Sequence, residues 1–62
     1  MRQFIVIARF NEKKTAIRVG VFDSSGPLNA AADARTLRGR EVAEQLGCEE
    51  SQLTWEVEED FL

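Results

Sequence analysis

Two short apolar stretches separated by a polar turn place the strongest constraint on this chain. Residues 3–10 and 15–22 alternate as strands with two distinct faces do, and residues 11–14 between them are all polar. A hairpin closing around this turn predicts the pairs Phe10–Thr15, Ala8–Ile17, Val6–Val19 and Phe4–Val21. Because opposed residues of an antiparallel pair share a face, this register places the apolar residues of these pairs together on one side.

A helix is predicted over residues 29–46, after a cluster of turn-forming residues at positions 23–27. Asn29 is the expected N-cap, and Gly47 occupies the position where a left-handed residue commonly ends a helix. The apolar positions fall into two groups that do not line up at 100° per residue. Ala30, Ala34 and Leu37 form the first group, and Val42 and Leu46 form the second. A kink, or two short helices meeting near Gly39, would reconcile them.

Residues 52–58 return to alternation and predict a third strand, followed by a short acidic tail over residues 59–62. The right-handed crossover rule places this strand parallel to the second one. The chain is therefore expected to be one α+β domain, residues 1–62, with ββαβ order. Its three-stranded antiparallel sheet has the order 2-1-3, and one helix lies on one face. The predicted core comprises Phe4, Val6, Ala8, Phe10, Ile17, Val19, Val21, Leu53, Trp55 and Val57, together with the helix.

The length and residue types limit how such a fold can be supported. A chain of 62 residues has room for one small core, and such domains often need a disulfide, a metal or a partner subunit. With one cysteine, Cys48, and no histidine, an internal disulfide and the common Cys/His zinc sites are excluded. Oligomerisation is the support that remains. A lone thiol fits a reducing, cytoplasmic setting, and neither a signal peptide nor an apolar stretch of membrane length is expected.

No residue set in the sequence predicts catalysis. Without histidine there is no Ser–His or Cys–His pair, and Glu49 and Glu50 beside Cys48 disfavour a reactive thiolate. Neither a phosphate loop nor a dinucleotide fingerprint is present. We therefore expect a non-enzymatic protein without a catalytic residue, cofactor or metal site.

The face of the sheet opposite the helix gives the leading functional hypothesis. In the predicted register this face retains apolar residues rimmed by charges, a combination that often marks an interface. The sequence thus favours a protein-interaction module or small regulator that forms a homodimer through this face or a sheet edge. The predicted contact residues are Ile5, Ile7, Arg9, Arg18 and Phe22. The alternative is that long Arg and Glu side chains cover Ile5 and Ile7 and that nothing binds there.

The charge distribution supplies a second hypothesis. All eight basic residues lie in the first 40 positions, whereas residues 41–62 hold eight acidic residues and no basic one. A nucleic-acid-binding protein would use the basic positions Arg35, Arg38, Arg40, Lys13 and Lys14 to contact phosphates. An acidic mimic of nucleic acid would instead present residues 56–60 to a basic protein.

Residues 40–53 resemble a helix-turn-helix segment through the spacing of Ala43, Gly47 and Leu53. The resemblance implies a second helix after Gly47 that would contact DNA. The glutamates of that segment repel phosphate, however, and the alternation of Leu53, Trp55 and Val57 favours a strand.

Overall fold

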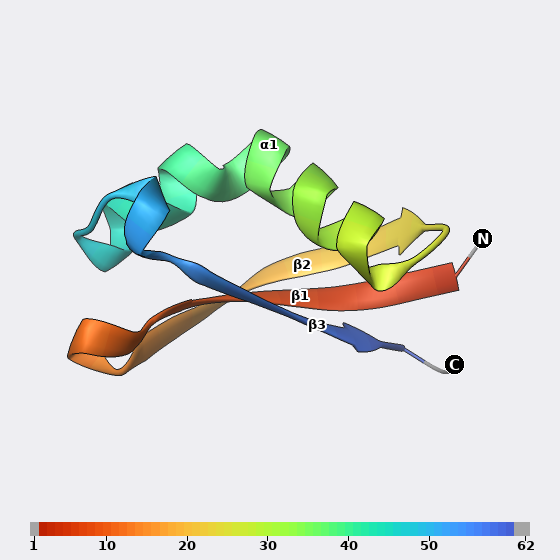
Figure 1. Cartoon of the computed structure of the whole chain (residues 1–62), viewed down its shortest axis with the longest axis horizontal. Helices are drawn as coiled ribbons and strands as arrows, with labels where there is room; N and C mark the ends of the chain where they lie inside the picture. Colours follow the sequence, from red (N-terminus) through yellow and green to blue (C-terminus); the bar gives the residue numbers. More distant parts are fainter. Residues whose placement is uncertain (1, 61–62) are drawn as a thin grey trace.

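The computed structural model describes residues 2–60 and confirms the expected α+β architecture (Figure 1). Two strands, β1 (Arg2–Phe10) and β2 (Thr15–Ser24), flank the short 3-10 turn η1 (Asn11–Lys13). The helix α1 (Pro27–Leu46) follows, then the 3-10 turn η2 (Glu50–Gln52) and the strand β3 (Thr54–Glu59). The sheet has the order β2-β1-β3, and β1 is antiparallel to both neighbours. The helix lies over one face of this sheet.

Strand β3 extends into the segment that was expected to be a tail. Glu59 belongs to β3, and the backbone N–H of Asp60 donates to the carbonyl of Gln3 at 2.9 Å. The strand thus ends at Glu59, one residue beyond the boundary predicted at residue 58, and Asp60 lies outside it. The remainder of that segment, residues 61–62, lies outside the described residues. After Gly47, the range that resembled a helix-turn-helix contains only the three-residue 3-10 turn η2, and the strand β3 follows it.

The core lies between the sheet and the helix. The buried residues of its central cluster are small or medium in size except for one aromatic ring, and they are Phe4, Val6, Ala8, Val19, Ala30, Ala34 and Val42. Ile17, Phe22, Leu46, Leu53, Trp55 and Val57 pack against them and are half-buried. The alanines let the helix backbone approach the sheet closely, and the alternate residues of β1 fill the space beneath it.

The pairing of β1 with β2 follows the predicted register only as far as Ile7. Phe10 opposes Thr15 and Ala8 opposes Ile17 as expected. A β-bulge then interrupts the ladder between Val6 and Ile7, so that Ile7 opposes Arg18 while Val6 opposes Gly20. Val19 is skipped, which shifts the rest of β2 by one residue.

This shift reverses two of the predicted orientations. Phe22 opposes Phe4 and packs against the core, although it was expected on the uncovered face. Val21 opposes Ile5 and is 44% exposed, although it was expected in the core. Both predictions are wrong for one reason: strict alternation assumes a regular ladder, and a bulge exchanges the faces of every residue beyond it.

The bulge depends on Gly20. Its φ of +153° lies in a region that residues with a side chain rarely adopt. A Cβ on Gly20 would lie 3.7 Å from Cε2 of Phe22, an ordinary contact distance, so the requirement for glycine comes from the backbone conformation and not from crowding.

The helix begins two residues earlier than expected and ends where it was predicted to end. Gly26 is the N-cap and Pro27 the first helical residue, so the prediction of Asn29 as N-cap is wrong. Proline suits this position because the first helical N–H groups have no partner within the helix. The side-chain amide of Asn29 donates instead to the hydroxyl of Ser25, at 2.8 Å. At the other end, Gly47 is left-handed, and the N–H groups of Gly47 and Cys48 close the last turn.

The helix runs without a break through Gly39 and arches over the sheet (Figure 1). Its sheet-facing positions follow an oblique i, i+4 row, namely Ala30, Ala34, Arg38, Val42 and Leu46. Leu37, which was expected in this stripe, is 71% exposed. Gly39 is buried because η2 approaches it, and a Cβ there would lie 2.6 Å from Oε1 of Glu50.

An ion pair joins the first residue of β1 to the last residue of β3. Arg2 donates from Nε and Nη2 to the two carboxylate oxygens of Glu59, at 2.8 and 2.6 Å. The guanidinium of Arg2 also lies 5.1 Å from the centroid of the Phe4 ring, a cation–π distance. The hydrogen bonds from Arg2 lower the pKa of the Glu59 carboxyl below its ordinary value.

We predict that Gly20→Ala lowers the free energy of unfolding by about 1–3 kcal/mol, because alanine is strained at this φ. Urea unfolding followed by tryptophan fluorescence measures the loss. The matched control is Gly26→Ala, since Gly26 has an extended φ of −170° and open space around its Cα. We expect the control to lose less than about 1 kcal/mol. Equal losses in the two variants would contradict a special role for Gly20.

We predict that the stability difference between the wild type and Glu59→Gln narrows as the pH falls. A carboxyl whose pKa is lowered on folding stabilises the folded chain above its unfolded-state pKa, and this contribution is lost as the pH falls through the folded-state value. Unfolding midpoints measured from about pH 7 down to about pH 3 test this prediction. Glu58→Gln removes a carboxylate from the same strand and serves as the control. A constant difference across that range would show that Arg2 does not favour the charged form of Glu59.

Candidate interaction surface

Alternation along three adjacent strands creates one surface on the side of the sheet opposite α1. We call it the open face, because no element within residues 2–60 covers it (Figure 1). Its members are Gln3, Ile5, Ile7 and Arg9 on β1, Ala16, Arg18, Val21 and Asp23 on β2, and Thr54, Glu56 and Glu58 on β3. The three strands thus contribute one continuous layer of side chains.

The ladder arranges the open face in rows across the sheet. One row runs from Val21 through Ile5 to Glu58, and the next runs from Arg18 through Ile7 to Glu56. The centre of the face is therefore apolar. In the row through Ile7, a basic side chain lies on the β2 side and an acidic one on the β3 side. Ile5 and Ile7 are half-buried between their neighbours, and Val21 is more exposed.

Four of the five predicted contact residues share this surface. Ile5, Ile7, Arg9 and Arg18 lie together on the open face, whereas Phe22 lies on the helix side. Val21 takes the place that Phe22 was expected to fill. The sequence contained a signal for this exchange, since a glycine inside an otherwise β-branched strand often marks a bulge.

The charged residues of the open face differ in how they are paired. Nε of Arg9 donates to Glu56, which raises the pKa of the Arg9 guanidinium. Arg18 and Glu58 make no ion pair within residues 2–60. The face therefore presents one internally neutralised pair, one cation near β2 and one anion near β3 that are free to meet opposite charges elsewhere.

The three arginines considered for anion binding have different surroundings. Arg38 donates from Nε and Nη2 to the Glu41 carboxylate at 2.9 and 3.2 Å, and from Nη1 to the carbonyl of Val19 at 3.3 Å. Arg35 lines a hollow beside β3, and Arg40 is exposed. Lys13 and Lys14 are exposed at the hairpin turn. The guanidinium of Arg38 is hydrogen-bonded to Glu41 and to the Val19 carbonyl at the bulge. The three arginines therefore do not form a uniform basic patch. Nucleic-acid binding stays a prediction.

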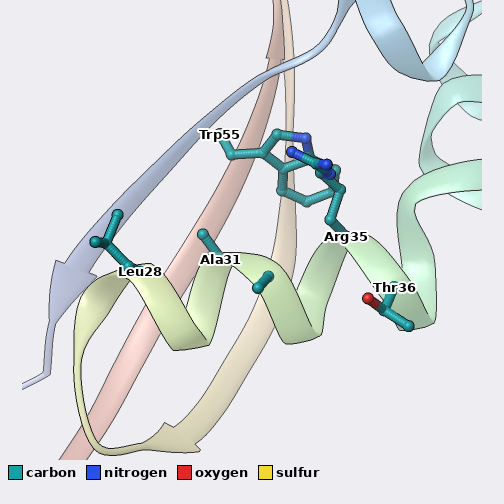
Figure 2. A pocket seen from close by; sticks show the side chains of 6 residues that line it. Leu28, Ala31, Arg35, Thr36 and Trp55 are labelled. Atoms are coloured by element: carbon teal, nitrogen blue, oxygen red, sulfur yellow. The ribbon is translucent and has the colours of Figure 1, made fainter.

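A shallow hollow of about 280 Å³ lies between the helix and β3 (Figure 2). Leu28, Ala31, Ala32, Arg35 and Thr36 line it from the helix, and Trp55 lines it from β3. Arg35 and Trp55 also line an adjoining hollow that reaches η2. The indole N–H of Trp55 is buried and makes no hydrogen bond within the described part of the chain. Leu28 is 85% exposed, so this side of the molecule is only partly closed by the helix.

The remaining chemistry-bearing groups are few. Cys48 is a half-buried free thiol at the end of the helix. Between residues 2 and 60, no cluster of three or more His, Cys, Asp or Glu side chains is arranged to hold a metal ion. Over the same residues, no helix has the length and apolarity needed to cross a membrane.

No family model, curated protein or solved structure matches this chain.

We predict that Arg38→Ala destabilises the fold by about 1–2 kcal/mol, because it leaves the bulge carbonyl of Val19 without its charged donor. Arg40→Ala removes a neighbouring exposed arginine and is expected to change stability by less than about 0.5 kcal/mol. Urea unfolding of both variants measures the difference. Equal stabilities would show that the Arg38 hydrogen bond contributes nothing to the fold.

Proposed function

We propose that this protein is a non-enzymatic interaction module that self-associates through the open face of its sheet. The observation that carries the proposal is the apolar centre formed by Ile5, Ile7 and Val21 on a face that no described element covers. An apolar patch rimmed by charges is the usual surface signature of an interface. Burying apolar side chains against a second copy would supply the support that a domain of this size commonly lacks.

The face is a better contact surface than either sheet edge. β3 is an outer strand with glutamates at positions 56, 58 and 59, and charged side chains discourage edge pairing. β2, the other outer strand, contains the bulge at Val19, which breaks the regular row of backbone groups that a new strand would need. Stacking of two open faces needs neither edge.

The expected affinity is modest. The Cα atoms span only 33 × 19 × 14 Å, and standard interfaces bury roughly 800 Å² on each partner. A dimer through one small face falls at or below that size. We therefore expect a dissociation constant of about 1–100 µM, with monomer and dimer both present at ordinary working concentrations.

We predict that Ile7→Glu and Val21→Glu each raise the dimer dissociation constant at least about tenfold. Each substitution introduces two carboxylates into a symmetric dimer, one from each chain, and both would be buried in the contact. Sedimentation equilibrium over a wide concentration range measures the shift. Leu37→Glu is the matched control, since it also replaces an exposed apolar residue but lies on the helix.

Two outcomes would overturn the proposal. One is a wild-type chain that sediments as a monomer at every concentration. The other is a dimer that both open-face variants leave intact. Val21→Glu guards against loss of folding in Ile7→Glu, because Val21 is exposed and outside the core. Circular dichroism confirms that each variant is folded before its mass is measured.

A further inference from the structure

We infer that two copies stack with their two-fold axis nearly parallel to β1, so that β2 of each copy lies over β3 of the other. This inference rests on the proposed self-association and specifies its geometry. It assigns a contact between Arg18 of one copy and the acidic pair Glu56 and Glu58 of the second copy. Two equivalent contacts of this kind form in each dimer.

Symmetry limits how two copies of the open face can cover one another. Two identical faces that cover one another are related by a two-fold axis lying in the plane between them. If that axis runs along the central strand, β1 lies over β1 and the two outer strands exchange places. If it runs across the strands, β2 lies over β2 and β3 lies over β3. Both arrangements keep the strands of the two sheets aligned, which is a common way for sheets to pack, so the charges have to distinguish them.

The charges on the two outer strands distinguish these arrangements. On the open face, β2 carries Arg18 and β3 carries Glu56 and Glu58. With the axis along β1, Arg18 faces the position of Glu56, since both oppose Ile7 in their own sheet. Glu58 is two residues further along the same strand. With the axis across the strands, the glutamates of the two β3 strands would instead lie over one another, and like charges at an interface are unfavourable.

The residues nearest the axis are those of β1. Ile7 meets Ile7 and Ile5 meets Ile5, which buries the apolar centre against itself. Arg9 also lies on β1, but its ion pair with Glu56 directs its guanidinium toward the β3 side of its own sheet. Because the axis along β1 places the two β3 strands on opposite sides, the two Arg9 head groups lean away from each other. The arrangement thus avoids a central repulsion.

The same arrangement brings the unpaired charges of the open face near opposite charges. Arg18 and Glu58 are the open-face Arg and Glu that make no ion pair within residues 2–60. The exchange of outer strands brings each of them near an opposite charge of the second copy. Arg9 and Glu56 already neutralise one another in each chain.

Charge reversal on each side separately, followed by mixing, tests this geometry. The variants are Arg18→Glu and Glu58→Arg. Either variant places a pair of like charges in each of the two contacts of its homodimer, and we expect the dissociation constant to rise about tenfold at low salt. In an equimolar mixture, the carboxylate introduced by Arg18→Glu meets the guanidinium introduced by Glu58→Arg, and the native Arg18 and Glu58 meet at the second contact. The mixture is expected to regain the wild-type dissociation constant within about threefold.

Arg40→Glu and Glu44→Arg are the controls, because they change net charge equally but lie on the helix. Each is expected to dimerise as the wild type does, alone and when mixed. Sedimentation equilibrium gives the dissociation constants, and native mass spectrometry distinguishes heterodimers from homodimers by mass. The effect of the charge-reversed pair should also weaken as salt is raised.

These measurements distinguish self-association through the open face from the particular geometry in which the outer strands exchange places. If Ile7→Glu and Val21→Glu disrupt the dimer but neither charge reversal weakens it, the proposed function stands and the strand exchange is wrong. If both reversals weaken the dimer and mixing does not restore it, the two charges do not face one another and the geometry is again wrong. If the wild-type chain is monomeric throughout, both the proposed function and the geometry fall.

Discussion

Val19 bulges out of the β1–β2 ladder, and both surfaces of the sheet depend on that one irregularity. The skipped residue turns Phe22 toward the helix and Val21 away from it. Gly20 supplies the backbone conformation, and Arg38 donates to the Val19 carbonyl from the helix. A local feature of a single strand thus determines which aromatic ring completes the core and which aliphatic side chain joins the open face.

A chain with three strands and one helix can cover only one side of its sheet. The central strand nevertheless has apolar side chains on both sides, with Phe4, Val6 and Ala8 beneath the helix. Ile5 and Ile7 face the other way and are half-buried by their neighbours. The proposed pairing with a second copy would remove this surface from water, because the two faces present identical apolar centres.

The arginines show how one residue type serves different purposes. Arg2 closes the outer ends of β1 and β3 through Glu59, and Arg38 fixes the helix to the bulge. Arg9 is paired across the open face with Glu56, whereas Arg18 is unpaired within residues 2–60. Three of the eight basic residues in the first 40 positions, Arg2, Arg9 and Arg38, thus pair with acidic residues of β3 or the helix.

The sequence by itself determined the elements, their order and most of the open face. Period-two alternation and turn residues specify the strands, and Gly47 specifies the helix end, because these signals depend only on local backbone geometry. Ile5, Ile7, Arg9 and Arg18 were placed correctly for that reason. Only the tertiary structure decided the faces of Val21 and Phe22 and the role of Arg38. Those depend on a bulge at which Gly20 supplies the backbone conformation and Arg38 of the helix donates to the Val19 carbonyl, and alternation along one strand carries no information about a residue that the ladder skips.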